Sequence, residues 1–174
     1  FGARDGIAFL CRTEVHSYER ARVCVQRKGM PVIVLQAEQL RALAVAIFQA
    51  AGASAGVAAQ VADSLVESNL RGYDSHGVMR VLEYVRQIRS GDLKPDAAMQ
   101  IVRETPTTAL VDGGWCFGQI VGRYAMRLAV DKARSGRLGA VGAVHCYHVG
   151  RLGEYAAMAA EEGMIGLALA NVVP

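Results

Sequence analysis

Apolar residues in the first half of the chain recur at helical spacing. The first stripe has members at i, i+3, i+4, i+7 and i+8, namely Leu40, Leu43, Ala44, Ile47 and Phe48. Such a stripe predicts an amphipathic helix, and Gly52 is suited to end it. A second helix is expected to start after Ser54, because apolar residues then follow at one-turn intervals until Gly72.

A third helix is expected to open at Asp74 or Ser75, since either residue is a good N-cap. It should run to Gly91, which is suited to stop a helix. Residues 30–92 are therefore predicted to form an N-terminal unit of three helices.

The pattern then changes to short β-branched runs that alternate with helical stretches. Two strands are expected at MQIVRE and TALVDG, and Gly113-Gly114 should close the second. The remaining elements are a helix over about 119–135, a strand at LGAVGAVH, a helix over about 150–162 and the strand-like apolar run MIGLALANV. Strands alternating with helices predict an α/β layer with a βαβ unit in residues 93–174.

Three side chains of the third predicted helix form a column. At about 100° per residue, His76, Arg80 and Tyr84 fall on one face of a continuous helix. The residues of the opposite face, which we expect in the core, are Val78, Val81, Leu82, Val85 and Ile88. An imidazole, a guanidinium and a phenol together suit an anionic substrate, with the guanidinium binding a carboxylate. A solvated helix face is the alternative interpretation of the same pattern.

His148 is a second candidate, within VHCYHVGRLGEY at 144–155. It lies between a predicted strand and a predicted helix, where α/β sheets commonly place ligands, and a histidine there can act as an acid or a base. The alternative is a turn histidine bonded to the backbone. His145, Cys146 and His148 could also be metal ligands, but no C-x-x-C or H-E-x-x-H partner occurs, so we predict no metal site.

The charge distribution argues against a nucleic-acid partner. The formal charge is +3, but residues 1–29 hold six basic and three acidic groups, which leaves 13 of each in residues 30–174. Residues 1–29 also lack helical periodicity. We predict that they are a disordered or non-native leader before a natural start at Met30.

Cysteine spacing and hydropathy point to a cytoplasmic protein. The four cysteines have no paired spacing, so a reducing compartment is favoured over a disulfide framework. No apolar run reaches the about 18 residues of a membrane span, so no membrane partner is expected.

Five ordered motifs carry a resemblance to a known family. They are LRGYDSHGVMR (70–80), RETPTTALVDG (103–113), GQIVGRYAM (118–126), HVGRLGEYA (148–156) and GMIGLALAN (163–171). Over residues 33–174 the chain resembles the malate/L-lactate dehydrogenase family, which includes ureidoglycolate, sulfolactate and Δ1-piperideine-2-carboxylate reductases. The resemblance implies an α/β fold that binds NAD or NADP without a Rossmann fingerprint. In agreement, neither G-x-G-x-x-G nor G-x-x-x-x-G-K-[ST] occurs.

The resemblance also implies a reaction, which is hydride transfer between NAD or NADP and a 2-hydroxy acid or its 2-oxo acid. By motif match, His148 is implied to exchange a proton with the substrate oxygen. Ser75 and His76 stand where the family has a catalytic Ser-His pair. The adjacent Asp74, Ser75 and His76 are not expected to be a hydrolytic triad, because a triad is built from side chains that converge from separate parts of a fold.

Binding roles follow from the same motif matches. Arg80 and Tyr84 match the family's contacts to the substrate carboxylate. The implied cofactor contacts are Val149, Gly150 and Asn171.

Length is the main departure from the family. Its members continue beyond the equivalent of Pro174, so the resemblance implies an N-terminal fragment of a protein that is a homodimer when full length. Such a fragment can carry the recognisable residues without activity. The competing hypothesis is a non-catalytic module that only dimerises or binds a small anion. The sequence does not choose between NAD and NADP, or among the 2-hydroxy acids.

Overall fold

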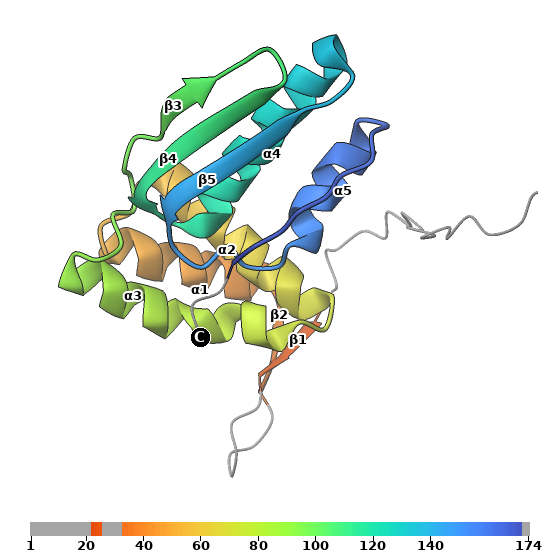
Figure 1. Cartoon of the computed structure of the whole chain (residues 1–174). Helices are drawn as coiled ribbons and strands as arrows, with labels where there is room; N and C mark the ends of the chain where they lie inside the picture. Colours follow the sequence, from red (N-terminus) through yellow and green to blue (C-terminus); the bar gives the residue numbers. More distant parts are fainter. Residues whose placement is uncertain (1–21, 26–32, 172–174) are drawn as a thin grey trace, which may run out of the picture.

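The computed structural model describes residues 22–25 and 33–171. Its elements are β1 (Arg22–Val25), β2 (Ile33–Gln36), α1 (Ala37–Ala50), α2 (Ala55–Leu70), the 3-10 turns η2 (Asp74–His76) and η3 (Val78–Arg80), α3 (Val81–Ser90), β3 (Gln100–Glu104), β4 (Thr108–Cys116), α4 (Gly118–Gly136), β5 (Ala140–Cys146) and α5 (Gly153–Glu161). Helices α1 to α3 gather on one side, and the sheet with α4 and α5 lies against them (Figure 1).

Helices α1 and α2 confirm the first two predicted helices. The side chain of Ser54 caps α2 by accepting the Val57 N–H, and Asp96 from the segment before β3 in turn accepts the Ser54 hydroxyl at 2.5 Å. The buried members of the α1 stripe are Leu40, Ala44 and Phe48. Leu43 is 53% exposed, so it lies at the edge of the stripe.

The third predicted helix is interrupted near its start, so the expectation of one continuous helix is wrong. Two 3-10 turns, η2 and η3, precede α3, and the backbone of Gly77 between them is extended. Asn69 of α2 fixes this break, because its side-chain oxygen accepts the Val78 N–H at 2.8 Å and its amide donates to Asp74 at 2.5 Å. A β-carbon on Gly77 would collide with the Asn69 side chain.

The interruption changes which side chains enter the core. Tyr84 is fully buried, and Leu82 is 66% exposed. A continuous helix predicted the opposite for these two residues. The predicted faces of α3 are therefore corrected at both positions.

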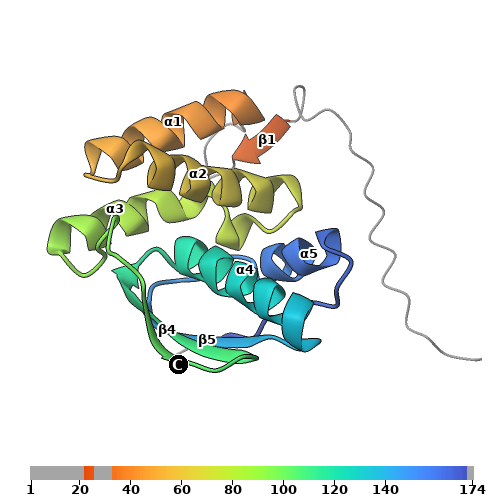
Figure 2. The same ribbon diagram turned by 90° about the horizontal axis from the view of Figure 1, so that it is seen from above.

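Strands β3, β4 and β5 form one sheet in that order. β3 is antiparallel to β4, and β4 is parallel to β5. Parallel neighbours need a crossover connection, which α4 supplies while packing on one face of the sheet (Figure 2). The predicted βαβ unit and the α/β class are confirmed, although β4 continues through Gly113-Gly114 to Cys116 instead of closing there.

The apolar run after α5 is not a strand in its described residues, 164–171, and this expectation was wrong. Ile165, Leu167 and Leu169 alternate along it and are 101%, 77% and 84% exposed. A strand needs a neighbour to pair with its backbone groups, and no strand among the described residues pairs with this segment. Helix α5 also begins later than expected, at Gly153.

Most of the predicted leader, residues 1–29, lies outside the described residues. Its described part is β1, which pairs antiparallel with β2 from Arg22 opposite Gln36 to Val25 opposite Ile33. At these positions the structure differs from an unstructured leader. That residues 1–29 are dispensable stays a prediction.

One core cluster joins the helical unit to the α/β layer. Phe48 of α1 and Tyr84 of α3 each lie with their ring centroid 5.6 Å from that of Phe117, which precedes α4. All three rings are fully buried, and aromatic pairs of this kind contribute about 0.5–1.5 kcal/mol beyond their burial. The predicted boundary between residues 30–92 and 93–174 remains a prediction, and the two parts share this core. Among the described helices, none is long and apolar enough to cross a membrane.

Candidate active site

His148 lies in the loop between β5 and α5, beyond the carboxyl ends of the parallel strands β4 and β5. This loop rests directly on the first turn of α4, because a β-carbon on Gly118 would stand 2.5 Å from the His148 carbonyl oxygen. Gly150 is buried and has φ +69°, a conformation that favours glycine. The backbone on both sides of the imidazole is therefore held closely.

Tyr155 holds the same loop from α5. Its phenol donates to the carbonyl of Val149, and its ring packs on Gly122 of α4, where a β-carbon would stand 2.5 Å from the ring carbon Cζ. Burial raises the pKa of the Tyr155 phenol, so it stays a donor. Gly118 and Gly122 lie one helical turn apart, and together they let the loop and α5 approach the backbone of α4.

Glu154 ties α5 to α2 and α4. Its carboxylate accepts hydrogen bonds from Ser64 Oγ at 2.6 Å and from Arg123 Nε at 2.5 Å, and the residue is only 9% exposed. Arg123 also approaches Asp63 at 3.6 Å. Because Glu154 is in the first turn of α5, the helix dipole also favours its negative charge.

His76 faces His148 across the junction of the two parts of the chain. Their rings are stacked, with centroids 5.3 Å apart and an interplanar angle of 29°. Ser75 Oγ lies 2.9 Å from His76 Nδ1, within hydrogen-bond distance. The break at Gly77 ends η2 right after His76, so the position of this ring depends on that break.

Tyr84 reaches the loop from the core. Its hydroxyl lies 2.7 Å from His148 Nδ1 and accepts a hydrogen bond from Gln119 Nε2 at 2.8 Å. Burial is the main cause that raises the pKa of Tyr84 to about 12, while the Gln119 hydrogen bond and Arg80 act in the opposite direction. The phenol therefore keeps its proton near neutral pH.

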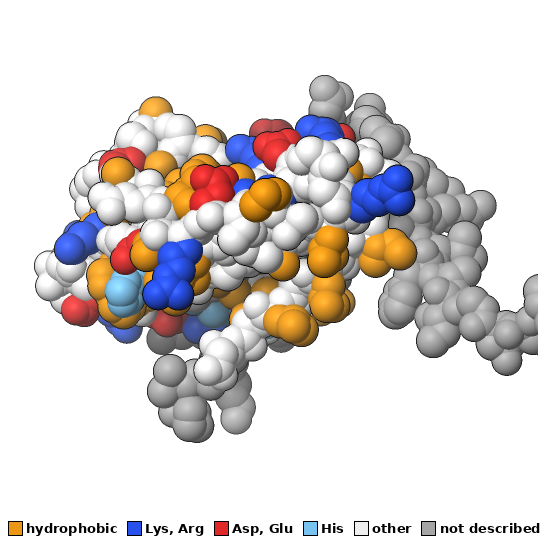
Figure 3. Space-filling model, turned by 45° about the horizontal axis from the view of Figure 1, so that its top comes forward, with side chains coloured by type: hydrophobic (Ala, Val, Ile, Leu, Met, Phe, Trp, Pro, Cys, Tyr) orange, Lys and Arg blue, Asp and Glu red, His pale blue; other side chains and the backbone are white. Residues whose placement is uncertain are grey.

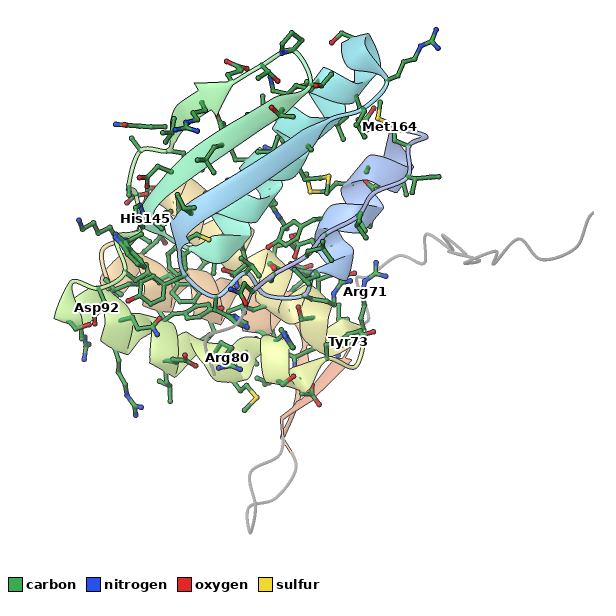
Figure 4. The ribbon with its side chains drawn as sticks, viewed as in Figure 1. Arg71, Tyr73, Arg80, Asp92, His145 and Met164 are labelled. Atoms are coloured by element: carbon green, nitrogen blue, oxygen red, sulfur yellow. The ribbon has the colours of Figure 1, made fainter. Side chains whose placement is uncertain are left out.

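Arg80 brings a positive charge to the same place, near the start of α3 (Figure 4). Its Nε donates to the Ser75 carbonyl at 2.7 Å, and its Nη1 lies 2.7 Å from a carboxylate oxygen of Glu83. Burial, followed by the nearby charges of Arg80 and His76, lowers the pKa of His148 below its ordinary value of 6.5, and Glu83 opposes this. His148 is thus held as a neutral imidazole near pH 7.

The structure brings five of the predicted residues into one continuous set of contacts. Arg80 contacts Ser75, Ser75 contacts His76, His76 stacks on His148, and His148 contacts Tyr84. We call these five residues the His148 cluster. Their roles stay predictions, as do those of Val149, Gly150 and Asn171.

The three predicted cofactor contacts differ in placement. Val149 and Gly150 continue the loop directly from His148. Asn171 is exposed on the segment after α5, and no hydrogen bond among the described residues joins it to the His148 cluster.

Two residues of the site carried no role in the sequence analysis. Gln119 is fully buried and contacts Tyr84, and Glu83 pairs with Arg80. Glu83 stands three residues after Arg80, an ordinary spacing for a helical ion pair. Gln119 lies inside the GQIVGRYAM motif, where a polar residue beside Gly118 was the available signal.

His145 is engaged elsewhere. Its Nδ1 lies 2.9 Å from Asp112 Oδ2, and its ring lies 5.1 Å from that of Trp115. Figure 4 shows it at the end of β5, apart from Arg80. Cys146 is a half-buried free thiol whose pKa is raised by burial.

One hollow in the described part of the chain is lined by none of the residues of the His148 cluster. It has a volume of about 540 Å³ and lies between α2, α4 and α5, where basic and acidic side chains both line it. On the face seen in Figure 3, charged side chains of both signs are likewise interspersed. The His148 cluster is identified by its contacts and chemistry instead.

Comparison with known proteins gives a consistent result. A model of the malate/L-lactate dehydrogenase family matches residues 35–174. A malate dehydrogenase of Pyrococcus abyssi is 45% identical over 114 residues, which are 66% of this chain and 32% of that protein. The L-sulfolactate dehydrogenase of Methanocaldococcus jannaschii is 33% identical over 142 residues, which are 82% of this chain and 41% of that protein.

Solved structures show the same similarity. The malate dehydrogenase of Pyrococcus horikoshii matches with a TM-score of 0.71 at 41% identity, over 73% of this chain and 36% of that one. The chain spans about a third of the length of the first curated relatives it matches.

Proposed function

The chain belongs to the malate/L-lactate dehydrogenase family, and we propose that it functions in an NAD(P)-dependent oxidoreductase. The reaction is hydride transfer between a nicotinamide cofactor and a 2-hydroxy acid or its 2-oxo acid. The observation that carries this proposal is the contact of His148 with both His76 and Tyr84, beside the Arg80 guanidinium. An imidazole on which a guanidinium charge acts supports the proposal, because such a substrate requires a group that exchanges a proton and a group that binds its carboxylate.

His148 is proposed to exchange a proton with the substrate oxygen. Tyr84 engages Nδ1, which leaves Nε2 as the nitrogen that can meet the substrate. When the hydroxy acid is oxidised, its hydroxyl proton goes to the protein as the C–H hydride leaves, and reduction runs the reverse course. A bound nicotinamide would supply the hydride acceptor or donor.

Arg80 is proposed to bind the substrate carboxylate. The bond from its Nε to the Ser75 carbonyl fixes the plane of the guanidinium. Glu83 holds Nη1, but its side chain is 43% exposed and can turn into water. A substrate carboxylate then replaces one carboxylate with another, so the cation is never left unpaired.

His76 and Ser75 are proposed to orient and support His148. The stacked ring of His76 restricts rotation of the His148 imidazole, and Ser75 restrains His76 through Nδ1. The close charge of a protonated His76 would also disfavour protonation of His148.

The loop after His148 is the proposed place of the cofactor, because it follows the imidazole directly. Gly150 in this loop is buried and has a left-handed backbone, and the Gln119 side chain packs where a β-carbon of Gly150 would point. Val149, Gly150 and Asn171 are the proposed cofactor contacts. A cytoplasmic location is also proposed, and the free thiols of Cys116 and Cys146 support it.

The test is an assay of the longest polypeptide that the gene encodes, with NAD⁺ or NADP⁺ and with malate, lactate and sulfolactate. We expect turnover of at least one acid, and a loss of about 10²–10⁴-fold in kcat for His148→Ala. His145→Ala is the matched control and should stay within a few-fold. No turnover with any pair, or equal losses in both variants, contradicts the proposal. Dimerisation or acid binding without turnover would favour the non-catalytic module.

A further inference from the structure

Gln119 is a fully buried polar side chain in the first turn of α4. Its Nε2 donates to the Tyr84 hydroxyl at 2.8 Å. Its Oε1 is buried and has no hydrogen-bond partner among the described residues. Leaving an amide oxygen unpaired in the interior costs free energy. The single bond that the amide makes runs from Nε2 to the Tyr84 hydroxyl.

The direction of that bond determines where the phenol proton points. Tyr84 has one hydroxyl proton, and its pKa of about 12 keeps that proton in place near neutral pH. Because Gln119 donates to the phenol oxygen, the phenol must donate to its other neighbour, His148 Nδ1, 2.7 Å away. A neutral imidazole whose Nδ1 accepts a hydrogen bond carries its own proton on Nε2.

We propose that Gln119 is a positioning residue that fixes, through Tyr84, which nitrogen of His148 carries the proton. The proposal rests on the proposed function only in making His148 the proton-exchanging group. In this arrangement the resting chain presents an N–H at Nε2, the nitrogen that faces a substrate. It is the form that gives a proton to a 2-oxo acid, and Nδ1 takes the Tyr84 proton as Nε2 releases its own. Oxidation of a hydroxy acid starts from the products of that step. The amide never contacts the reacting atoms.

The same network opposes a proton on Nδ1. With Nδ1 protonated, both Gln119 and His148 would donate to the Tyr84 oxygen, and the phenol proton would have no acceptor within the Gln119–Tyr84–His148 network. Turning the amide so that Oε1 faces Tyr84 removes this conflict, since the phenol can then donate to it. The direction of the amide and the protonation state of His148 are therefore coupled.

The tautomer can be measured without any activity. In the ¹⁵N-histidine-labelled chain, long-range ¹H–¹⁵N spectra above the pKa of His148 distinguish a protonated ring nitrogen from an unprotonated one. We expect His148 to show a protonated Nε2 and an unprotonated Nδ1. A protonated Nδ1 in the unmodified chain would overturn the proposal.

Variants test the link to Gln119. In Gln119→Glu the carboxylate accepts a hydrogen bond from the phenol, so the phenol oxygen can accept one from His148. His148 should then change to the Nδ1-protonated form, and its pKa should rise. Gln49→Glu, on the exposed surface of α1, adds the same charge away from the network and should leave the tautomer unchanged. An unchanged tautomer in folded Gln119→Glu would refute the proposal.

Tyr84→Phe covers the case in which Gln119→Glu does not fold. It removes the relay, so His148 should become a mixture of tautomers, and a retained single Nε2 form would refute the relay. The protein could show the expected His148 tautomers and still turn over no 2-hydroxy acid. That result would support the Gln119–Tyr84–His148 network and contradict only the proposed function.

Discussion

The carbonyl oxygen of His148 lies so close to Gly118 that a β-carbon on residue 118 would stand only 2.5 Å from it. Both this oxygen and the Tyr147 carbonyl are backbone atoms that would meet a β-carbon there, so neither can turn aside as a side chain would. We predict that Gly118→Ala lowers the free energy of unfolding by about 2 kcal/mol or more, as overpacking does. Urea unfolding measures this.

Gly56 provides the matched control. It lies in α2, and a β-carbon there would have nothing within 4 Å. Gly56→Ala should therefore stabilise the chain by up to about 1 kcal/mol through helix propensity. Equal effects of the two substitutions would show that the loop does not rest on α4 as described.

Glu154→Gln should destabilise the chain strongly. The substitution leaves Arg123, whose side chain is 17% exposed, with only the longer contact to Asp63. Breaking a buried pair on one side costs on the order of 3 kcal/mol. The exposed pair of Asp131 and Arg134 gives the comparison, because Asp131→Asn should change the unfolding free energy by less than about 1 kcal/mol. Similar losses in the two variants would argue against a stabilising role of the bonds from Ser64 and Arg123 to Glu154.

Substitutions of Arg80 and of Glu83 should affect KM for the acid differently in the longest polypeptide that the gene encodes. Arg80→Lys keeps the charge and loses the planar fork, so KM for the acid should rise with the loss of about 1.5–3 kcal/mol per charged hydrogen bond. Glu83→Gln removes the competing carboxylate and should leave KM unchanged or lower it. A higher KM in Glu83→Gln would mean that Glu83 positions Arg80 instead of competing for it.

Acidification should destabilise the chain through His148. Its pKa is lowered in the folded state by burial, Arg80 and His76 against the effect of Glu83, so the unfolded chain binds more protons just below the ordinary value of 6.5. The unfolding free energy must then fall as the pH falls through 6.5 toward the lowered pKa. Urea unfolding between about pH 5 and about pH 7.5 should show a shallower dependence in His148→Gln. Parallel pH dependences of the unfolding free energy in the unmodified chain and in His148→Gln would contradict the lowered pKa of His148.

Periodicity and β-branched runs predicted most of the helices and strands. The helices α1, α2 and α4 followed from the spacing of apolar residues, and the parallel pair β4 and β5 followed from short apolar runs. The break at Gly77 did not, because it depends on Asn69 of another helix. The strand expected at 164–171 failed for a similar reason, since pairing requires a neighbour that spacing cannot reveal.

The candidate site was predictable in its members and less so in its geometry. His148 lies between a strand and a helix, as its position in the sequence indicated. A straight helix placed Tyr84 on the polar face, whereas the interruption turns its ring into the core. Gln119 gave little signal, because an amphipathic pattern assigns polar residues to the surface and a buried amide is recognised only through its partner.

The shared aromatic core has a consequence for synthesis of the chain. When the ribosome has produced α1 to α3, Phe48 and Tyr84 exist, but Phe117, which covers both, still has to be made. Until then the nascent helices present an apolar face, the kind of surface that chaperones bind. His148 is synthesised later still, after α1 to α4. Its imidazole can therefore contact His76 and Tyr84 only after the helices that carry them have been made.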